Sequence, residues 1–71
     1  MPRFRDLKRY LDRNGWECWK NTHHMFYRKL EDGQYRHTYV SHSLGKEIPP
    51  SVWKKILKKD LGISQEEFNQ K

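Results

Sequence analysis

The chain has 71 residues, a mass of 8.8 kDa and a formal net charge of +6, which is enough for one small domain over residues 1–71 and excludes a multi-domain enzyme. The excess of Lys and Arg favours polyanionic partners. A single cysteine excludes an intramolecular disulfide, and the lack of a long apolar run predicts a cytoplasmic protein that is neither exported nor inserted in a membrane.

Apolar side chains at helical spacing predict an amphipathic helix near the start of the chain. Phe4, Leu7 and Leu11 recur every three or four residues, with charged residues between them. Asn14-Gly15 follows and is a typical helix stop. We expect the chain to leave the helix there.

Three strands are predicted next. Residues 16–20 alternate in character, and Asn21-Thr22 interrupts the alternation before a second strand that starts at His23. Asp32-Gly33 is a strong hairpin signal, and the aromatic and β-branched residues 35–42 behind it predict a third, antiparallel strand.

Two helices complete the chain. Pro49-Pro50 opens the first of them, which ends at Gly62. Its predicted apolar stripe is Val52, Trp53, Ile56, Leu57 and Leu61. Ser64 stands three residues before Glu67, as in a capping box, and predicts a short last helix. The order predicts an α+β fold with one three-stranded antiparallel sheet and helices packed on one of its faces.

Four histidines fall in or beside the predicted sheet, at positions 23, 24, 37 and 42. Adjacent residues of a regular strand point to opposite faces, so we expect His23 and His24 to diverge and at most one of them to be catalytic. A metal site from Cys18 and two histidines is an alternative, but no ligand pair has the close spacing of structural zinc. We expect Cys18 to be buried and the tryptophans Trp16, Trp19 and Trp53 to lie in the core.

A histidine on a basic surface can cut RNA without a metal. The imidazole titrates near neutral pH, so it can take a proton from the ribose 2′-hydroxyl or give one to the departing 5′-oxygen. A nearby Lys or Arg would stabilise the charge on the phosphorane. Spacing alone does not separate such a histidine from one with a structural role.

Longer sequence segments are better evidence of function than the spacing of single residues. Five segments, in chain order, form a recognisable pattern: Gly15-Trp16, residues 20–28 (KNTHHMFYR), residues 40–49 (VSHSLGKEIP), Ile56-Leu57-Lys58, and residues 61–64 (LGIS). With these segments the chain resembles the HicA family of toxin ribonucleases over nearly its whole length. The resemblance implies an α-β-β-β-α fold similar to a double-stranded-RNA-binding domain, metal-independent cleavage of single-stranded mRNA with no cofactor, and inhibition by a HicB-type antitoxin protein.

The resemblance also implies roles for single residues. The family's Gly-Ser-His-His motif corresponds to Asn21-Thr22 and the two histidines here, which places the catalytic histidine at His24. Asn21 lacks the freedom of a glycine at positive φ. His42 matches a second recurring family histidine, followed by Gly-Lys-Glu with Lys46, and Ser41 and Ser43 stand near positions where the family often has proline.

Further RNA contacts are predicted around His24. Phe26 and Arg28 share its strand face if the strand is regular. Phe26 can stack on a base or pack in the core, and Arg28 can bind a phosphate or remain solvated. Together with Lys20 at the turn, the predicted RNA-binding residues are Lys20, Phe26, Arg28, His42 and Lys46.

Three functions are compatible with these features. The first is the toxin of a type II toxin-antitoxin system, an endoribonuclease (mRNA interferase) with His24 as general acid or base. The second is a non-catalytic RNA-binding module. The third is a protein-interaction module, in which the lysines at 54, 55, 58 and 59 dock an acidic partner; these lysines can equally grip RNA or form a solvated face. A second proton-transfer group, His37 or His42, is left open.

Overall fold

The computed structural model describes residues 2–70, and its first element is the predicted amphipathic helix. Helix α1 (Phe4–Arg13) buries the apolar stripe Phe4, Leu7, Tyr10 and Leu11. Asp6 in its first turn accepts a hydrogen bond from the Arg3 amide at 2.8 Å, where a negative charge also suits the helix dipole. Gly15 follows the helix at a φ of +80°, which turns the chain towards the sheet.

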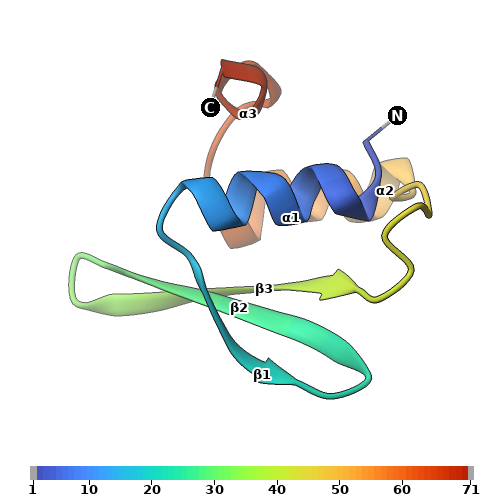
Figure 1. Cartoon of the computed structure of the whole chain (residues 1–71). Coiled ribbons are helices and arrows are strands. Elements are labelled where there is room, and N and C mark those ends of the chain that lie inside the picture. Colours follow the sequence, from blue (N-terminus) through green and yellow to red (C-terminus); the bar gives the residue numbers. More distant parts are fainter. Residues whose placement is uncertain (1, 71) are drawn as a thin grey trace.

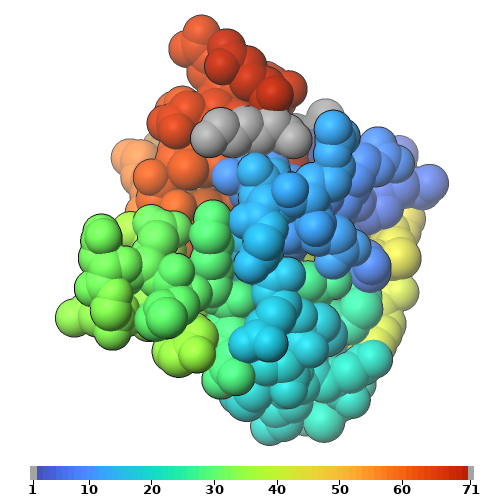
Figure 2. Space-filling model, turned by 60° about the vertical axis from the view of Figure 1, so that its left-hand side comes forward, coloured from blue at the N-terminus to red at the C-terminus, as the bar shows by residue number. Residues whose placement is uncertain are grey.

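The three strands form one antiparallel sheet in the order β1-β2-β3, as predicted. They are β1 (Glu17–Asn21), β2 (His24–Glu31) and β3 (Gln34–Ser41). Asp32 and Gly33 join β2 to β3 with φ values of +51° and +79°, the left-handed pair that a two-residue hairpin requires. In Figure 2 this hairpin, in green, extends beyond the helices.

The second predicted helix is continuous but changes its winding. Helix α2 (Pro50–Lys55) passes directly into the π-helical segment η1 (Ile56–Leu61), which ends at Gly62 with a φ of +66°. The predicted extent is therefore confirmed, whereas the wider winding of its second half was not predicted. Within residues 2–70, none of the helices combines the length and the apolar character that crossing a bilayer requires.

The core lies between the sheet and one layer of helices. Tyr27 and Val40 point from the sheet into this layer and are almost completely buried, as are Leu7 and Ile56 opposite them. Thr38 is a buried polar residue of the core, and its hydroxyl donates to Asp60 Oδ2 at 3.1 Å. Helices α1 and α2 lie on the same side of the sheet, so its other face is not covered by them (Figure 1). The α-β-β-β-α order with helices on one face is confirmed.

A short helix, α3 (Gln65–Gln70), lies beyond α1 and α2, on the side away from the sheet (Figure 1). Its Phe68 ring packs 4.9 Å from the ring of Tyr10 and 4.7 Å from that of Trp53. The amide of Glu67 donates to the Ser64 hydroxyl at 3.1 Å, so the predicted capping box is present. Aromatic packing therefore fixes α3 on the helix layer.

Candidate nucleic-acid interface

The uncovered face of the sheet carries aromatic and cationic side chains. Because Tyr27 and Thr38 point into the core, the residues that alternate with them point to the opposite face. We call this uncovered surface the open face; its aromatic and cationic residues are Trp19, Lys20, His24, Phe26, Arg28, Tyr35 and His37. Tyr39 has the same alternation, but its ring packs partly against the core beside Phe4 and is not counted here. Glu17, opposite Arg28, is the acidic residue that the strand alternation places there within residues 17–41.

His24 begins β2 at one end of the open face, opposite Ser41. Its ring lies 5.1 Å from the ring of Tyr39 and 6.1 Å from that of Phe26. The imidazole is half-buried, and its Nδ1 atom is enclosed without a hydrogen-bond partner among the described residues. Neighbouring aromatic rings, and not a carboxylate, therefore hold this ring in place.

The expected divergence of the two adjacent histidines is wrong. The ring of His23 lies 5.8 Å from the ring of His24 and 6.4 Å from that of Phe26. The reason is that β2 begins only at His24, so His23 belongs to the turn and does not follow the strand alternation. Both rings therefore gather around Phe26, with His23 the more exposed of the two.

Phe26 lies on the open face, so the alternative that it packs in the core is wrong. It is paired with Lys20 across the strands, and the Lys20 ammonium lies 5.7 Å from the centre of the ring. The rings of Trp19 and of the two adjacent histidines cover part of Phe26, which leaves it half-buried. Two predicted RNA-binding residues, Lys20 and Phe26, thus lie in contact beside His24.

Arg28 shares the face of His24, as predicted, but its guanidinium is already paired. Its Nε donates to Glu17 Oε1 at 2.6 Å, and this hydrogen bond raises the pKa of Arg28. The guanidinium carbon lies 4.7 Å from the ring centre of Tyr35 and 5.5 Å from that of Trp19. A phosphate that binds Arg28 therefore competes with Glu17.

Trp19 and Cys18 are exposed, so their predicted burial is wrong, whereas Trp16 and Trp53 are buried as predicted. Every residue of β1 is exposed, because the helix layer packs on β2 and β3, which supply the core residues Tyr27 and Val40. The register is irregular between Cys18 and Lys20, and Trp19 lies at this irregularity. The centre of its ring lies 6.1 Å from that of His37, and the residue is 45% exposed.

The remaining two predicted contacts lie beyond β3. His42 Nε2 is 3.0 Å from the carbonyl oxygen of Thr22, so it donates there and links the end of β3 to the turn before His24. This places His42 at the same end of the sheet as His24. Lys46 lies in the next loop, where its carbonyl accepts from the Phe4 amide at 3.1 Å, at the start of α1.

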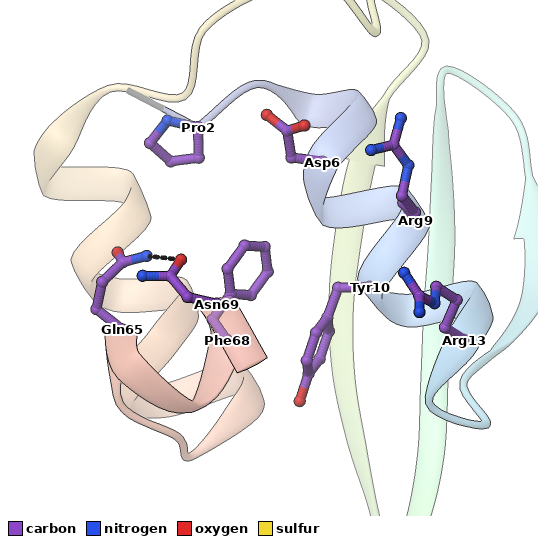
Figure 3. A pocket seen from close by; sticks show the side chains of 8 residues that line it. All are labelled: Pro2, Asp6, Arg9, Tyr10, Arg13, Gln65, Phe68 and Asn69. Carbon is purple, nitrogen blue, oxygen red and sulfur yellow. Dashed lines mark hydrogen bonds between the residues drawn. The ribbon is translucent and has the colours of Figure 1, made fainter. Parts of the chain in front are cut away.

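Other candidate surfaces are separate from His24. Within residues 2–70, no three His, Cys, Asp or Glu side chains come together as a metal site. A groove of about 660 Å³ lies between α1 and α3, with Arg9, Arg13 and Tyr10 on one side and Phe68 on the other (Figure 3). The lysines of α2 and η1 are exposed and belong to the helix layer, away from the open face.

Three residues of the open face were not among the predicted site residues: Trp19, Tyr35 and His37. The signal for two of them is present in the sequence, because positions 35, 37 and 39 are Tyr, His and Tyr with period two. Trp19 could not be placed this way, since the register irregularity breaks the alternation of β1.

Comparison of the chain with known protein families, with curated proteins and with solved structures finds no match.

Proposed function

We propose that the protein is a metal-independent endoribonuclease that cuts single-stranded RNA with His24, as the toxin of a HicA-type toxin-antitoxin pair. One observation carries the proposal. The half-buried imidazole of His24 lies at the end of a basic, aromatic sheet face, beside the ring of Phe26 and the ammonium of Lys20. Stacking rings and cations on an open sheet are the features that bind single-stranded RNA.

The chemistry needs one proton acceptor or donor beside a bound phosphate. The ribose 2′-oxygen forms a bond to the adjacent phosphorus, the bond from phosphorus to the 5′-oxygen breaks, and the products are a 2′,3′-cyclic phosphate and a 5′-hydroxyl. Because Nδ1 of His24 is enclosed, Nε2 is the nitrogen that would exchange a proton with the substrate. Lys20, which contacts the same Phe26 ring, is placed to stabilise the phosphorane charge.

The surroundings of His24 predict slow cleavage. His37 is paired with Arg28, four residues along β2 from His24, and the hydrogen bond from His42 Nε2 to the Thr22 carbonyl gives His42 a structural role in the turn. In this proposal neither of them acts with His24, so only one of the two proton transfers would be assisted. Slow cutting suits a toxin, because few cuts in mRNA stop translation.

The resemblance supports a partner and a place of action. A HicB-type antitoxin would inhibit the protein by covering the open face, and both would act in the cytoplasm, where mRNA is found. The positive charge of the chain, +6, is compatible with an acidic surface on such a partner.

The test is a cleavage assay in EDTA with a labelled single-stranded RNA. We expect the parent protein to cut and His24→Ala to lose at least about a hundredfold in rate, the scale of general acid–base catalysis. His23→Ala is the comparison variant: it removes a ring that contacts His24 and Phe26 but keeps the His24 imidazole, so it should lose less activity than His24→Ala. His37→Ala and His42→Ala should retain more activity than His24→Ala.

Circular dichroism confirms that each variant is folded. Equal cleavage by the parent and by folded His24→Ala would contradict the proposal. So would the loss of activity in His37→Ala or His42→Ala to the level of His24→Ala, since the site would then have two essential histidines.

A non-catalytic module that binds RNA on the same face is the second candidate. It is favoured by one observation, the lack of any hydrogen-bonded group that orients His24 through Nδ1. In the same assay this function predicts intact RNA together with a salt-sensitive shift of RNA mobility.

A further inference from the structure

We propose that Phe26, Trp19, His37 and Tyr35 form a base-stacking track that leads single-stranded RNA away from His24 along the open face. This inference rests on the RNA-binding part of the proposed function and names how the RNA is held. It gives Trp19, which lies on β1 and outside the cleavage site, a direct share in the affinity for RNA.

The rings of the track follow one another without a gap. From His24, the ring centres of Phe26, Trp19, His37 and Tyr35 are separated in turn by 6.1, 6.5, 6.1 and 6.3 Å. These rings come from all three strands, so the track crosses the sheet from the start of β2 towards the β2–β3 hairpin.

The exposure of the track points to an occupant. Trp19 is 45% exposed and Tyr35 is 48% exposed, and both lie on the sheet face that no described helix covers. Isolated exposed aromatic residues are ordinary, but a connected row of them on one face is a typical binding surface. Flat, exposed rings can stack on bases of any sequence.

The charges on the face favour RNA over a protein segment. Lys20 lies over Phe26, and Arg28 lies over both Trp19 and Tyr35, so two cations flank the track. Glu17 is the acidic residue among them, and it is paired with Arg28. Cations beside stacking rings match a polymer of bases linked by phosphates.

Glu17 also limits the affinity for RNA, because it competes with phosphate for Arg28. While its carboxylate holds Arg28 Nε at 2.6 Å, a phosphate must displace it to reach the guanidinium. Glu17→Gln removes this competitor but keeps the shape of the side chain. We expect RNA to bind about threefold tighter, and the dependence of affinity on salt to steepen by about 0.7 in the logarithmic slope, as for one more phosphate contact on a single strand.

The test measures binding by fluorescence anisotropy in a His24→Ala background, so that RNA stays intact. The probes are a labelled octamer of uridylate and an octamer of the same backbone without bases. We expect Trp19→Ala to weaken binding of the uridylate octamer about tenfold and to leave the base-free octamer unchanged. Trp19→Tyr, which keeps a flat ring, should stay within about threefold of the parent.

Leu30→Ala is the matched control for a loss of exposed apolar surface. Leu30 is 57% exposed on the same strand face and is outside the track. It should bind both probes like the His24→Ala parent. Thermal melting of every variant checks that the sheet is intact.

The outcomes test the stacking track independently of the cleavage reaction. Base-dependent binding that Trp19→Ala weakens supports the track, even where the unmutated protein fails to cut RNA. Equal losses for the two probes, or unchanged binding in Trp19→Ala, would overturn it. Binding of an acidic peptide at this face with no binding of either octamer would also overturn it, and would assign the face to a protein partner.

Discussion

At the scale of single residues, a polar network fixes β2 to α1 beneath the open face. The Tyr27 hydroxyl donates to Asp12 Oδ1 at 2.9 Å, and Lys8 Nζ donates to Asp12 Oδ2 at 2.8 Å. Burial, followed by the hydrogen bond to Asp12, raises the pKa of Tyr27. The next residue, Arg28, points to the open face, so this network also positions a residue of the site.

The raised pKa of Tyr27 predicts how stability depends on alkaline pH. Below pH ~10 the phenol is protonated in both the folded and the unfolded chain, so it adds no pH dependence. Above that pH the unfolded chain loses the proton first, and the free energy of unfolding falls until the pH passes the folded pKa. Urea unfolding between pH 7 and 11 measures this fall.

Tyr27→Phe should remove part of that fall and cost about 1 kcal/mol at pH 7, the value of one hydrogen bond. Tyr10, whose pKa burial also raises, is unchanged in the variant, so some alkaline sensitivity should remain. An unaltered alkaline profile in Tyr27→Phe would contradict the role given to this hydroxyl.

At the scale of elements, the end of η1 depends on a backbone conformation that suits glycine. Gly62 has a φ of +66°, and a Cβ atom there would lie 2.9 Å from Arg36 Nη1. We expect Gly62→Ala to lower the free energy of unfolding by about 1–2 kcal/mol, because the Cβ atom of alanine crowds the backbone in the left-handed conformation. Thermal or urea unfolding measures the loss.

Gly33→Ala is the matched comparison, because Gly33 has a φ of +79° and nothing lies within 4 Å of the added Cβ. If Gly62→Ala loses more free energy of unfolding than Gly33→Ala, the difference measures the cost of the close contact between the added Cβ atom and Arg36. Since Arg36 is a flexible surface side chain, the difference should be below about 1 kcal/mol. Full stability of Gly62→Ala would contradict the proposed end of the helix.

The helices and strands could be predicted from the sequence, whereas the burial and the neighbours of single residues within them could not. Helical spacing, the Asp32-Gly33 turn and the Ser64-Glu67 box are local signals, and each lies where it was expected. The burial of Trp19 was predicted wrongly, because exposure depends on which strands the helix layer covers and on the side to which the register irregularity of β1 turns the ring. The place of His23 depends on where β2 begins, a boundary that its residue types do not fix.

The candidate site shows the same division. His24, Phe26 and Arg28 share a face because strand alternation dictates it, and this was predictable. The ion pair of Arg28 with Glu17 was not, because it depends on the register between β1 and β2. Lys46 was selected by resemblance alone, and its backbone lies against the start of α1.

At the scale of the whole molecule, positive charge is found on the open face and on the helix layer. The open face has Lys20 and Arg28 beside aromatic rings; the helix layer has the exposed arginines of α1 and the row of lysines on α2 and η1. All of them would attract RNA at low salt, but the open face joins a row of aromatic rings to a histidine. RNA is therefore expected on the sheet and not on the helices.

A nuclear magnetic resonance titration tests this expectation most directly. Uniformly ¹⁵N-labelled His24→Ala protein is titrated with the uridylate octamer, and the indole signals serve as reporters. We predict a large shift of the Trp19 indole and of amides in β1 to β3, with an unchanged indole at Trp53, which is hydrogen-bonded to Gln65 at 2.6 Å. Shifts confined to the helix layer, in α1 or in the lysine row at positions 54, 55, 58 and 59, with Trp19 unmoved, would contradict binding of RNA to the sheet.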